Sequence, residues 1–375
     1  MVREFFQRAL RRTVIRLTNK YSSRPVKERV YDALTALYAH IQKEPGKKGL
    51  YLQMEKEDKF IIFSDQHKGA RNYADDFALA ERNYIAALSF YNDCSYQYIS
   101  LGDSEELWEN LLDQVIKHNK ETFEAEKLLL QRQAFIKIFG NHDLYWDNDP
   151  LAQLNLHNIY GEKLKIYEGA ILKADINGND LHFFLTHGHQ GDLQSDGNWF
   201  SKWFVSTIWA PLQAYLMINP NTPAYDDQLK SDHNRLMYEW SSMQKNIILI
   251  TGHTHQPIFA SLTHLERIYR QLNRVRELKD VSEVSRLEKE LNSRIRKDDL
   301  PPDFTSYKPN YFNTGCCCFD DGDITGIEIA DGKISLVKWE YNDQNISVRI
   351  VLEETDLETL LEQNVEAIVP TISHL

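Results

Sequence analysis

The sequence predicts an α/β fold built on a layered sheet. Short apolar runs of strand length are separated by longer segments whose polar and apolar residues recur at helical spacing. The C-terminal part is richer in strand-like runs than the rest of the chain. A hydrophobic content of 42% over 375 residues is enough for a packed core in one large domain, or in one domain with appendages. Short buried strands divided by helices are typical of layered α/β sheets.

Two series of apolar runs define the expected strands. The first series is divided by long helix-like segments and comprises 59–64, 96–101, 134–139, 181–186 and 246–251. The second series follows toward the C-terminus and comprises 309–314, 323–330, 333–341 and 346–354. The segment "ADGKIS", at 330–335, separates two of these runs and is typical of a tight hairpin turn.

The strand pattern defines a main domain, 58–354, with a segment on either side. Residues 1–50 are expected to form a basic helical segment, and 355–375 a C-terminal tail. Two insertions interrupt the main domain. The first, 192–245, is rich in aromatic residues between Trp199 and Trp209; the second, 262–299, is highly charged and has the spacing of one or two long amphipathic helices.

The first thirty residues are strongly basic, and two interpretations of them stay open. Apolar residues recur at helical spacing between Val2 and Leu17, which predicts an amphipathic helix. That helix could pack on the main domain with its basic face in solvent. It could instead contact an anionic membrane surface through 1–30, together with the aromatic stretch 199–218.

The composition argues against some classes of protein. A net charge of −12 is unfavourable for a nucleic-acid binder that depends on bulk charge. The cysteines, Cys94 and the run Cys316–Cys318, lack the spacing of a disulfide framework or of a CxxC zinc site, and the run is expected to supply small buried residues. With no secretory signal and no apolar stretch of membrane-spanning length, we expect a cytoplasmic protein.

Each run of the first series ends in a cluster of polar residues. The clusters are Asp65-Gln66-His67, Gly102-Asp103, Gly140-Asn141-His142-Asp143, His187-Gly188-His189 and Gly252-His253-Thr254-His255. In an open α/β sheet, ligands bind beyond the carboxyl ends of the strands, so we expect these clusters to converge. One such cluster could be an accident of composition, or a helix N-cap in the case of Asn-His-Asp. Their joint occurrence indicates a single site.

The chemistry of these clusters predicts bound metal. Without partners, so many polar groups would be costly to bury. Carboxylate, imidazole and amide oxygen suit Mn, Fe or Zn, and the absence of thiolate among them argues against a structural zinc site. The candidate ligands exceed what one ion needs, so we expect two divalent ions that share a bridging carboxylate, with Mn favoured over Fe or Zn.

In this order, the motifs SDQH, LGDSEE, FGNHD, LTHGH and TGHTH resemble those of the calcineurin-like metallophosphoesterases. The resemblance extends from about Lys59 to about Gly315, outside the two insertions. It implies a β-sandwich of metallophosphoesterase type, flanked by helices and carrying a helical cap insertion. It also implies a ligand set: Asp65, His67 and His255 for one ion, Asn141, His187 and His253 for the other, and Asp103 as the bridge. His189 stays an alternative to His187, although the position next to the strand favours His187.

The same resemblance implies that His142 is catalytic. Its imidazole would stand over the substrate phosphate, to balance charge or to protonate the leaving group, and Asp143 would orient the ring. A hydroxide held between two cations is a nucleophile near neutral pH, so we expect hydrolysis of a phosphomono-, phosphodi- or pyrophosphate ester. Lys68 and Arg71 could also meet a phosphate, although a solvated loop is the slightly preferred interpretation.

The substrate is less defined than the chemistry. The motifs LGDSEELWE and GHTHQP resemble UDP-2,3-diacylglucosamine hydrolase most, which implies a lipid-linked or nucleotide-sugar substrate. That family is shorter, usually has arginine at the position of His142 and lacks the 262–299 insertion. A nuclease or protein phosphatase of the same superfamily stays an alternative. So does a non-catalytic module that uses 262–299 to bind a partner or to form a dimer, although every ligand position is filled.

Overall fold

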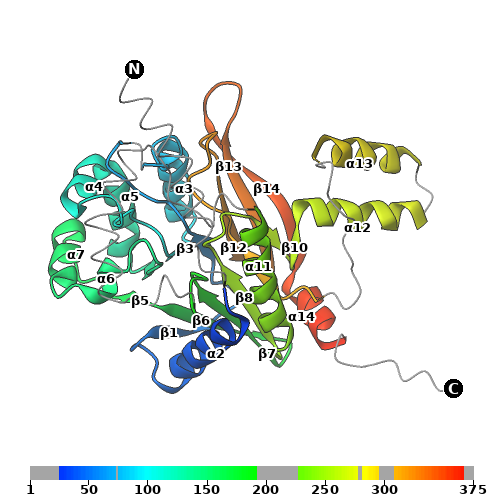
Figure 1. Cartoon of the computed structure of the whole chain (residues 1–375), viewed down its shortest axis with the longest axis horizontal. Helices are drawn as coiled ribbons and strands as arrows, with labels where there is room; N and C mark the ends of the chain where they lie inside the picture. Colours follow the sequence, from blue (N-terminus) through cyan, green and yellow to red (C-terminus); the bar gives the residue numbers. More distant parts are fainter. Residues whose placement is uncertain (1–24, 73–74, 192–226, 278–280, 295–307, 367–375) are drawn as a thin grey trace, which may run out of the picture.

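The protein folds as two stacked β-sheets between layers of helices (Figure 1). The computed structural model describes residues 25–72, 75–191, 227–277, 281–294 and 308–366. Across the first sheet, the strands are β14 (Ser347–Asp356), β13 (Lys333–Tyr341), β12 (Ile324–Ala330), β2 (Phe60–Phe63), β3 (Gln97–Leu101), β4 (Phe135–Ile138) and β5 (Ile166–Tyr167). Across the second, they are β1 (Gly49–Met54), β6 (Gly169–Ile176), β7 (Asn179–Thr186), β8 (Ile247–Thr251), β11 (Tyr311–Asn313), β9 (Ile258–Phe259) and β10 (Leu262–Thr263).

The central strands of each sheet run parallel, which places their carboxyl ends together. In the first sheet β2, β3, β4 and β5 are parallel neighbours. In the second sheet β8 lies between β7 and β11 and is parallel to both. Parallel strands with short apolar sequences need cover on both faces, and the two sheets and their helices provide it.

The main core lies between the two sheets. Side chains alternate along a strand, so Phe60 and Ile62 of β2 point into this core, where they join Phe183 of β7 and Ile250 of β8. Ile61 and Phe63 point the other way, toward the helices. The layered α/β prediction and the implied β-sandwich flanked by helices are confirmed for the described residues.

Helices cover both outer faces of the sandwich (Figure 1). The first sheet packs against α3 (Glu81–Asp93), α4 (Leu112–His118), α5 (Lys120–Gln131), α6 (Tyr145–Asn148) and α7 (Ala152–Tyr160). The second packs against α2 (Lys27–Lys43) and α11 (Asp227–Ser242). In α2, Val30, Leu34, Leu37 and Ile41 recur at three- and four-residue spacing, and this apolar stripe is buried on the sheet.

The predicted strands and the hairpin appear at the expected positions. Ala330 pairs with Lys333, so Asp331 and Gly332 form a two-residue loop between β12 and β13. Both loop residues have positive φ, 53° and 76° respectively. Such a turn matches the right-handed twist of the paired strands, which is why Asp-Gly is favoured there.

The ends of the domain differ from the expected boundaries. Strand β1 (Gly49–Met54) crosses the expected end of the segment 1–50, which also contains helix α2, and pairs with β6. Within the expected tail 355–375, residues 357–366 form helix α14, and Leu357, Leu360 and Leu361 are buried in the main core. Both elements bury apolar faces that their short sequences reveal only weakly. The basic residues 1–24 and the aromatic stretch 199–218 lie outside the described residues.

The charged insertion contains two helices, α12 (His264–Glu277) and α13 (Val281–Arg294), which project from the side of the sandwich (Figure 1). Ile268, Leu272 and Leu287 form a small buried cluster between them. Arg267 fastens α12 to the sheet, because its guanidinium contacts Glu353 of β14 at 2.9 Å. In the described parts of the chain, no helix is both long and apolar enough to cross a membrane.

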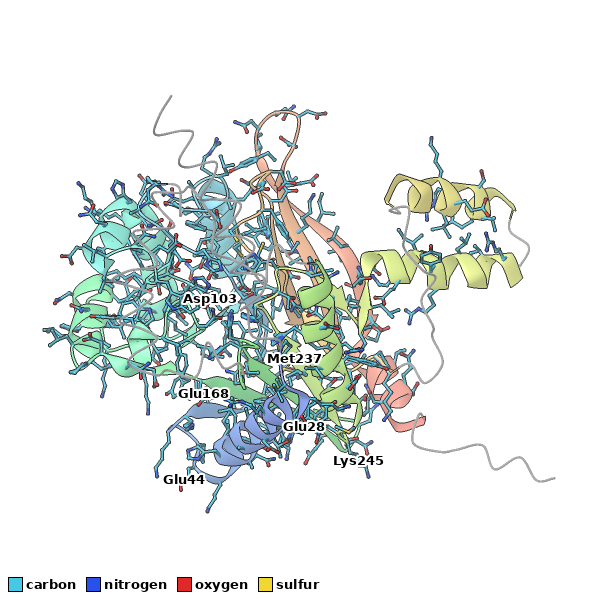
Figure 2. The ribbon with its side chains drawn as sticks, viewed as in Figure 1. Glu28, Glu44, Asp103, Glu168, Met237 and Lys245 are labelled. Carbon is cyan, nitrogen blue, oxygen red and sulfur yellow. The ribbon has the colours of Figure 1, made fainter. Side chains whose placement is uncertain are left out.

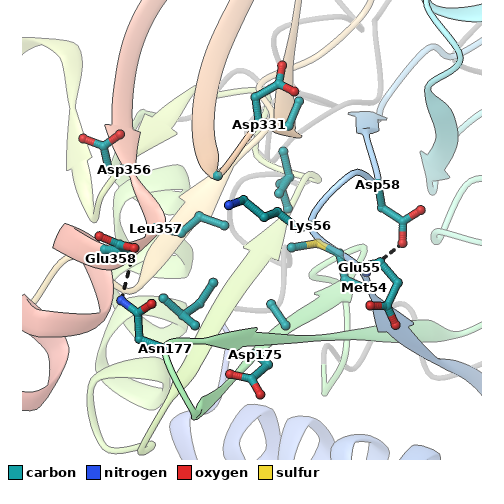
Figure 3. A pocket seen from close by; sticks show the side chains of 15 residues that line it. Met54, Glu55, Lys56, Asp58, Asp175, Asn177, Asp331, Asp356, Leu357 and Glu358 are labelled. Carbon is teal, nitrogen blue, oxygen red and sulfur yellow. Dashed lines mark hydrogen bonds between the residues drawn. The ribbon is translucent and has the colours of Figure 1, made fainter.

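A pocket of about 380 Å³ lies at the end of the sandwich opposite the carboxyl ends of β2 and β7 (Figure 3). Its walls are the segment before β2, the β6–β7 and β12–β13 turns, and the start of α14. Acidic side chains such as Asp175, Asp356 and Glu358 line it, with Lys56 among them. None of the predicted site residues lines this pocket.

Candidate metal centre

The polar clusters meet where the strands of both sheets end. Backbone hydrogen bonds join the loops: Asp65 N donates to Gly102 O at 3.0 Å, and His67 N donates to Asp103 O at 2.9 Å. His187 Nδ1 contacts Leu101 O at 2.8 Å and links the loop after β7 to the first sheet. Figure 2 shows Asp103 between the α3–α7 helices and the strands. The loops therefore form one interlocked unit.

The backbone at this unit is strained at the predicted ligands. Asp65, His67, Asp103, His253 and His255 all have positive φ, between 50° and 70°. Residues with a β-carbon seldom adopt this left-handed conformation, which costs roughly 1–3 kcal/mol per residue. Strain of this kind persists where the surrounding fold imposes it, and it concentrates at functional sites.

Glycine permits the close approach of the loops. A β-carbon at Gly140 would overlap the Asp103 carboxylate and lie 2.7 Å from His187 Cδ2. A β-carbon at Gly252 would overlap the Asp65 carboxylate in the same way. At both positions a side chain would displace a carboxylate, so the glycines of FGNHD and TGHTH are required by packing.

The first ligand group joins Asp65, His67 and His255. His67 Nε2 and His255 Nε2 face each other at 3.1 Å, and His255 Nε2 lies 3.2 Å from Asp65 Oδ1. His67 Nε2 is 3.9 Å from the same oxygen. Two imidazole nitrogens and a carboxylate oxygen that converge in this way could hold one divalent ion.

The second ligand group joins Asp103, His187 and His253. His187 Nε2 is 3.0 Å from Asp103 Oδ2, without the alignment of a hydrogen bond. Asn141 is buried nearby in the loop after β4, and its Oδ1 has no hydrogen-bond partner within the described residues. A buried amide oxygen and a buried imidazole nitrogen without partners are costly, and a cation would satisfy both. The residues present therefore fit the expected metal.

The electrostatics of the candidate metal centre also suit a cation. Burial would raise the pKa of the Asp103 carboxyl, but the His187 and His142 rings hold that pKa well below its usual range. Burial alone would lower the pKa of His187, but Asp103 and Asp65 outweigh it and raise the pKa to about 9. Asp103 and Asp65 thus draw a proton onto the His187 ring, and a divalent ion would compete with that proton.

His142 lies beside both groups and is held on two sides. Its Nδ1 contacts Glu106 Oε2 at 2.7 Å, and its ring stacks on Trp108 with centroids 4.2 Å apart. The backbone N–H of His142 donates to Asp103 Oδ1 at 2.8 Å. Glu106 Oε2 also lies 2.9 Å from His67 Nδ1, so one carboxylate fixes the catalytic candidate and a metal-ligand candidate.

Asp143 does not have the predicted partner. Its Oδ1 accepts a hydrogen bond from Gly140 N at 2.5 Å, and its Oδ2 accepts one from Ser104 N at 2.9 Å. The carboxylate therefore closes the Asn-His-Asp loop and ties it to the loop after β3. The role of holding the His142 ring, expected for Asp143, belongs to Glu106 in the structure.

Two histidines near the second group differ in position from the ligand candidates. His189 is buried beside His187, with ring centroids 5.4 Å apart, and is absent from the convergent ligand groups. His233, on α11, contacts Gly188 O at 2.5 Å and packs edge-on against His253. The sequence contained no signal for His233, because it lies in the insertion 192–245, far from any ligand motif.

Beneath the centre lies a buried network of charges. Lys68 Nζ contacts Glu105 at 3.0 Å and Glu126 at 2.7 Å, and Lys137 Nζ contacts Glu105 at 2.9 Å. All four side chains are fully buried. Lys68 is therefore neither a phosphate contact nor a solvated loop residue; it anchors the loop after β2 to helix α5 through Glu126. Arg71 is likewise engaged, with Asp75 and Glu81.

Comparison with known proteins adds little to this geometry. No family model and no curated protein matches the chain. Vacuolar protein sorting 29 from Cryptosporidium parvum is similar over 80% of this chain and 100% of that chain, with 11% identity and a TM-score of 0.32. A candidate 5′-nucleotidase from Staphylococcus aureus, in complex with alpha-ketoglutarate, is similar over 83% of this chain and 58% of that one, with 12% identity and a TM-score of 0.31. Similarity this low carries no argument about function, so only the site itself bears on it.

Proposed function

We propose that this chain is a calcineurin-like metallophosphoesterase that uses two divalent ions to hydrolyse a phosphoester. The observation that carries the proposal is the position of Asp103. Its Oδ2 lies 3.0 Å from His187 Nε2 and 3.9 Å from His67 Nε2, so one carboxylate reaches both ligand groups. A carboxylate shared by two ligand groups is what a two-metal hydrolytic site requires.

The ligand residues divide between the two ions as the motifs imply. One ion would be held by Asp65, His67 and His255, the other by Asn141, His187 and His253, and both by Asp103. When bound, the ions would polarise the phosphoryl group and lower the pKa of a water molecule. Oxygen and imidazole ligands favour manganese, with iron or zinc as the other candidates.

His142 would supply the positive charge or the proton on the substrate side. Glu106 engages Nδ1, which leaves Nε2 to meet a phosphoryl or leaving-group oxygen. Stacking on Trp108 fixes the plane of the ring. Both contacts hold His142 in one orientation before substrate arrives, which lowers the cost of reaching the transition state.

Within the phosphoesters, we propose a lipid-linked or nucleotide-sugar substrate. The support is the likeness of LGDSEELWE and GHTHQP to the diacylglucosamine hydrolase motifs, together with the tryptophan-rich stretch after the fourth ligand motif. A peripheral membrane contact through 1–30 and 199–218, on the cytoplasmic face, would bring such a substrate to the site. Binding to anionic vesicles, lost on deletion of 1–30, is the test of that contact.

Metal content and turnover of two variants test the phosphoesterase proposal. We expect two manganese ions in the wild type and turnover of aryl mono- or diesters or of a nucleotide-sugar lipid. His142→Ala should retain both ions and lose about 10²–10⁴-fold in turnover. Asp103→Asn should lose ions and turnover together. His157→Ala, on the exposed face of α7, is the matched control and should change neither.

Three outcomes would contradict the proposal or one of its parts. A folded wild type that takes up no divalent ion would favour a non-catalytic module. Wild-type turnover by His142→Ala would remove His142 from catalysis. Salt-sensitive binding and cleavage of DNA, without turnover of the small esters, would point instead to a nuclease.

A further inference from the structure

The cysteine run lies directly behind the first ligand group. Cys316, Cys317 and Cys318 are all buried. Cys317 belongs to the apolar cluster between the first sheet and its helices, and its Sγ lies 4.0 Å from Thr325 O. Cys316 and Cys318 lie on the other side, with His255. Within the run, the thiol of Cys317 therefore packs in the core, whereas those of Cys316 and Cys318 lie beside the His255 imidazole.

His255 stands between two chemically different surroundings. Its Nε2 faces the oxygen-rich side, 3.2 Å from Asp65 Oδ1. Its Nδ1 faces the sulfur side, 3.7 Å from Cys318 Sγ. The ligand atoms of His255, Cys316 and Cys318 all lie within 4.8 Å of one another. Two sulfurs and one ring nitrogen thus lie close together, with Nδ1 of His255 on the sulfur side and its Nε2 beside Asp65.

We propose that Cys316 Sγ, Cys318 Sγ and His255 Nδ1 form a separate site for one thiophilic cation such as Zn²⁺. Thiolate and imidazole select zinc and related soft ions, whereas the carboxylate side of His255 suits manganese. Each cysteine releases its thiol proton to solvent on binding. This site does not depend on the proposed phosphoesterase activity, although it shares His255 with that centre.

Access to the site is limited but present. His255 is 12% exposed and Cys318 is 7% exposed, so a cation can enter from the surface beside them, while Cys316 is almost fully buried. Three protein ligands leave the fourth position of a tetrahedral zinc ion open. Such a site exchanges its ion more readily than a closed four-ligand structural site.

The shared imidazole couples the two sites. A neutral imidazole has one lone pair available for a metal, and its other nitrogen carries a proton. When Nε2 serves the manganese side, Nδ1–H points at the Cys318 sulfur. When Nδ1 binds a thiophilic cation, Nε2–H points at Asp65. Occupation of the thiol site therefore weakens the first manganese position, and manganese weakens the thiol site by the same factor.

Cadmium is the probe for this site, because thiolate ligands give a cadmium charge-transfer band in the ultraviolet that oxygen and imidazole ligands do not. In a Cys94→Ser background, which removes the exposed cysteine, we expect one Cd²⁺ per chain with this band. Cys316→Ser/Cys318→Ser should abolish the band. Cys318→Ser alone, at the more exposed position, should weaken Cd²⁺ binding by at least tenfold and guards against misfolding of the double variant.

The second readout is manganese affinity, measured by electron paramagnetic resonance. One equivalent of Cd²⁺ should weaken one manganese position in the Cys94→Ser protein, and this effect should vanish in the double cysteine variant. A band that survives in the folded double variant, or a folded Cys94→Ser protein without a band, overturns the proposal. Asp103→Asn should keep the band, so failure of the phosphoesterase centre and failure of the thiol site are distinguishable.

Discussion

Replacement of Gly140 by alanine measures how closely the Asn-His-Asp loop approaches the shared carboxylate. The new β-carbon would overlap Asp103 Oδ1 and lie 2.6 Å from the Asp103 backbone nitrogen and 2.7 Å from His187 Cδ2, whereas ordinary contacts begin near 3.4 Å. Asp103 or the loop must therefore move by about 1 Å, and overpacking of this size costs roughly 1–3 kcal/mol. Gly140 does not have positive φ, so backbone strain adds nothing to this cost.

The expected result is a folded protein with a damaged centre. A misplacement of about 1 Å costs roughly 10²-fold in turnover, and we expect that loss together with weaker binding of at least one manganese ion. Metal content, kcat/KM on an aryl phosphodiester and denaturant unfolding check the three effects separately. A Gly140→Ala protein with two tightly bound ions and turnover within twofold of wild type would refute the reasoning.

Gly178→Ala is the control for this experiment. Gly178 lies in the β6–β7 turn with φ +81°, and its β-carbon would meet nothing within 4 Å. The substitution strains the backbone without a clash and far from the centre. It should lower the free energy of unfolding while metal content and turnover stay unchanged, which separates lost stability from a displaced carboxylate.

Three further predictions follow from the contacts. Glu106→Gln should lower turnover about 10–100-fold, measured together with metal content, because the carboxylate charge beside His142 and His67 is gone. Lys68→Met should cost about 3–5 kcal/mol in denaturant unfolding, because two buried carboxylates lose a partner; unchanged stability would show that the network is dispensable. Burial lowers the pKa of His182 in the folded protein. Below about pH 6.5 the unfolded chain therefore binds a proton at this ring that the folded chain does not bind. Stability should fall as the pH drops through that range, and His182→Phe should flatten the fall in pH-dependent melting curves.

The positions of the strands could be predicted because each is a short apolar run that stops at a polar cluster. Parallel central strands then bring those clusters to one end of the sandwich, which is why Asp65, Asp103 and His253 could be grouped before any geometry was known. The tight turn at Asp331 and Gly332 was predictable for a local reason, since few residue pairs accept two positive φ angles.

The partner of His142 could not be predicted in this way. Asp143 is its neighbour in sequence, but adjacent side chains on a tight turn point in different directions. Glu106 reaches the ring from 36 residues away, through the packing of two loops against each other. The burial of Lys68 was hidden for the same reason, because its carboxylate partner Glu126 comes from a helix that no motif marks.

The two ligand groups take residues from both sheets. Asp65 and Asp103 follow strands of the first sheet, whereas His187 and His253 follow strands of the second. A chain still emerging from the ribosome therefore could not bind the proposed ions until synthesis has passed His255 and the two sheets have packed together. The ions would be acquired late, and once bound they would link the two sheets. Chelation should therefore destabilise this end of the molecule first.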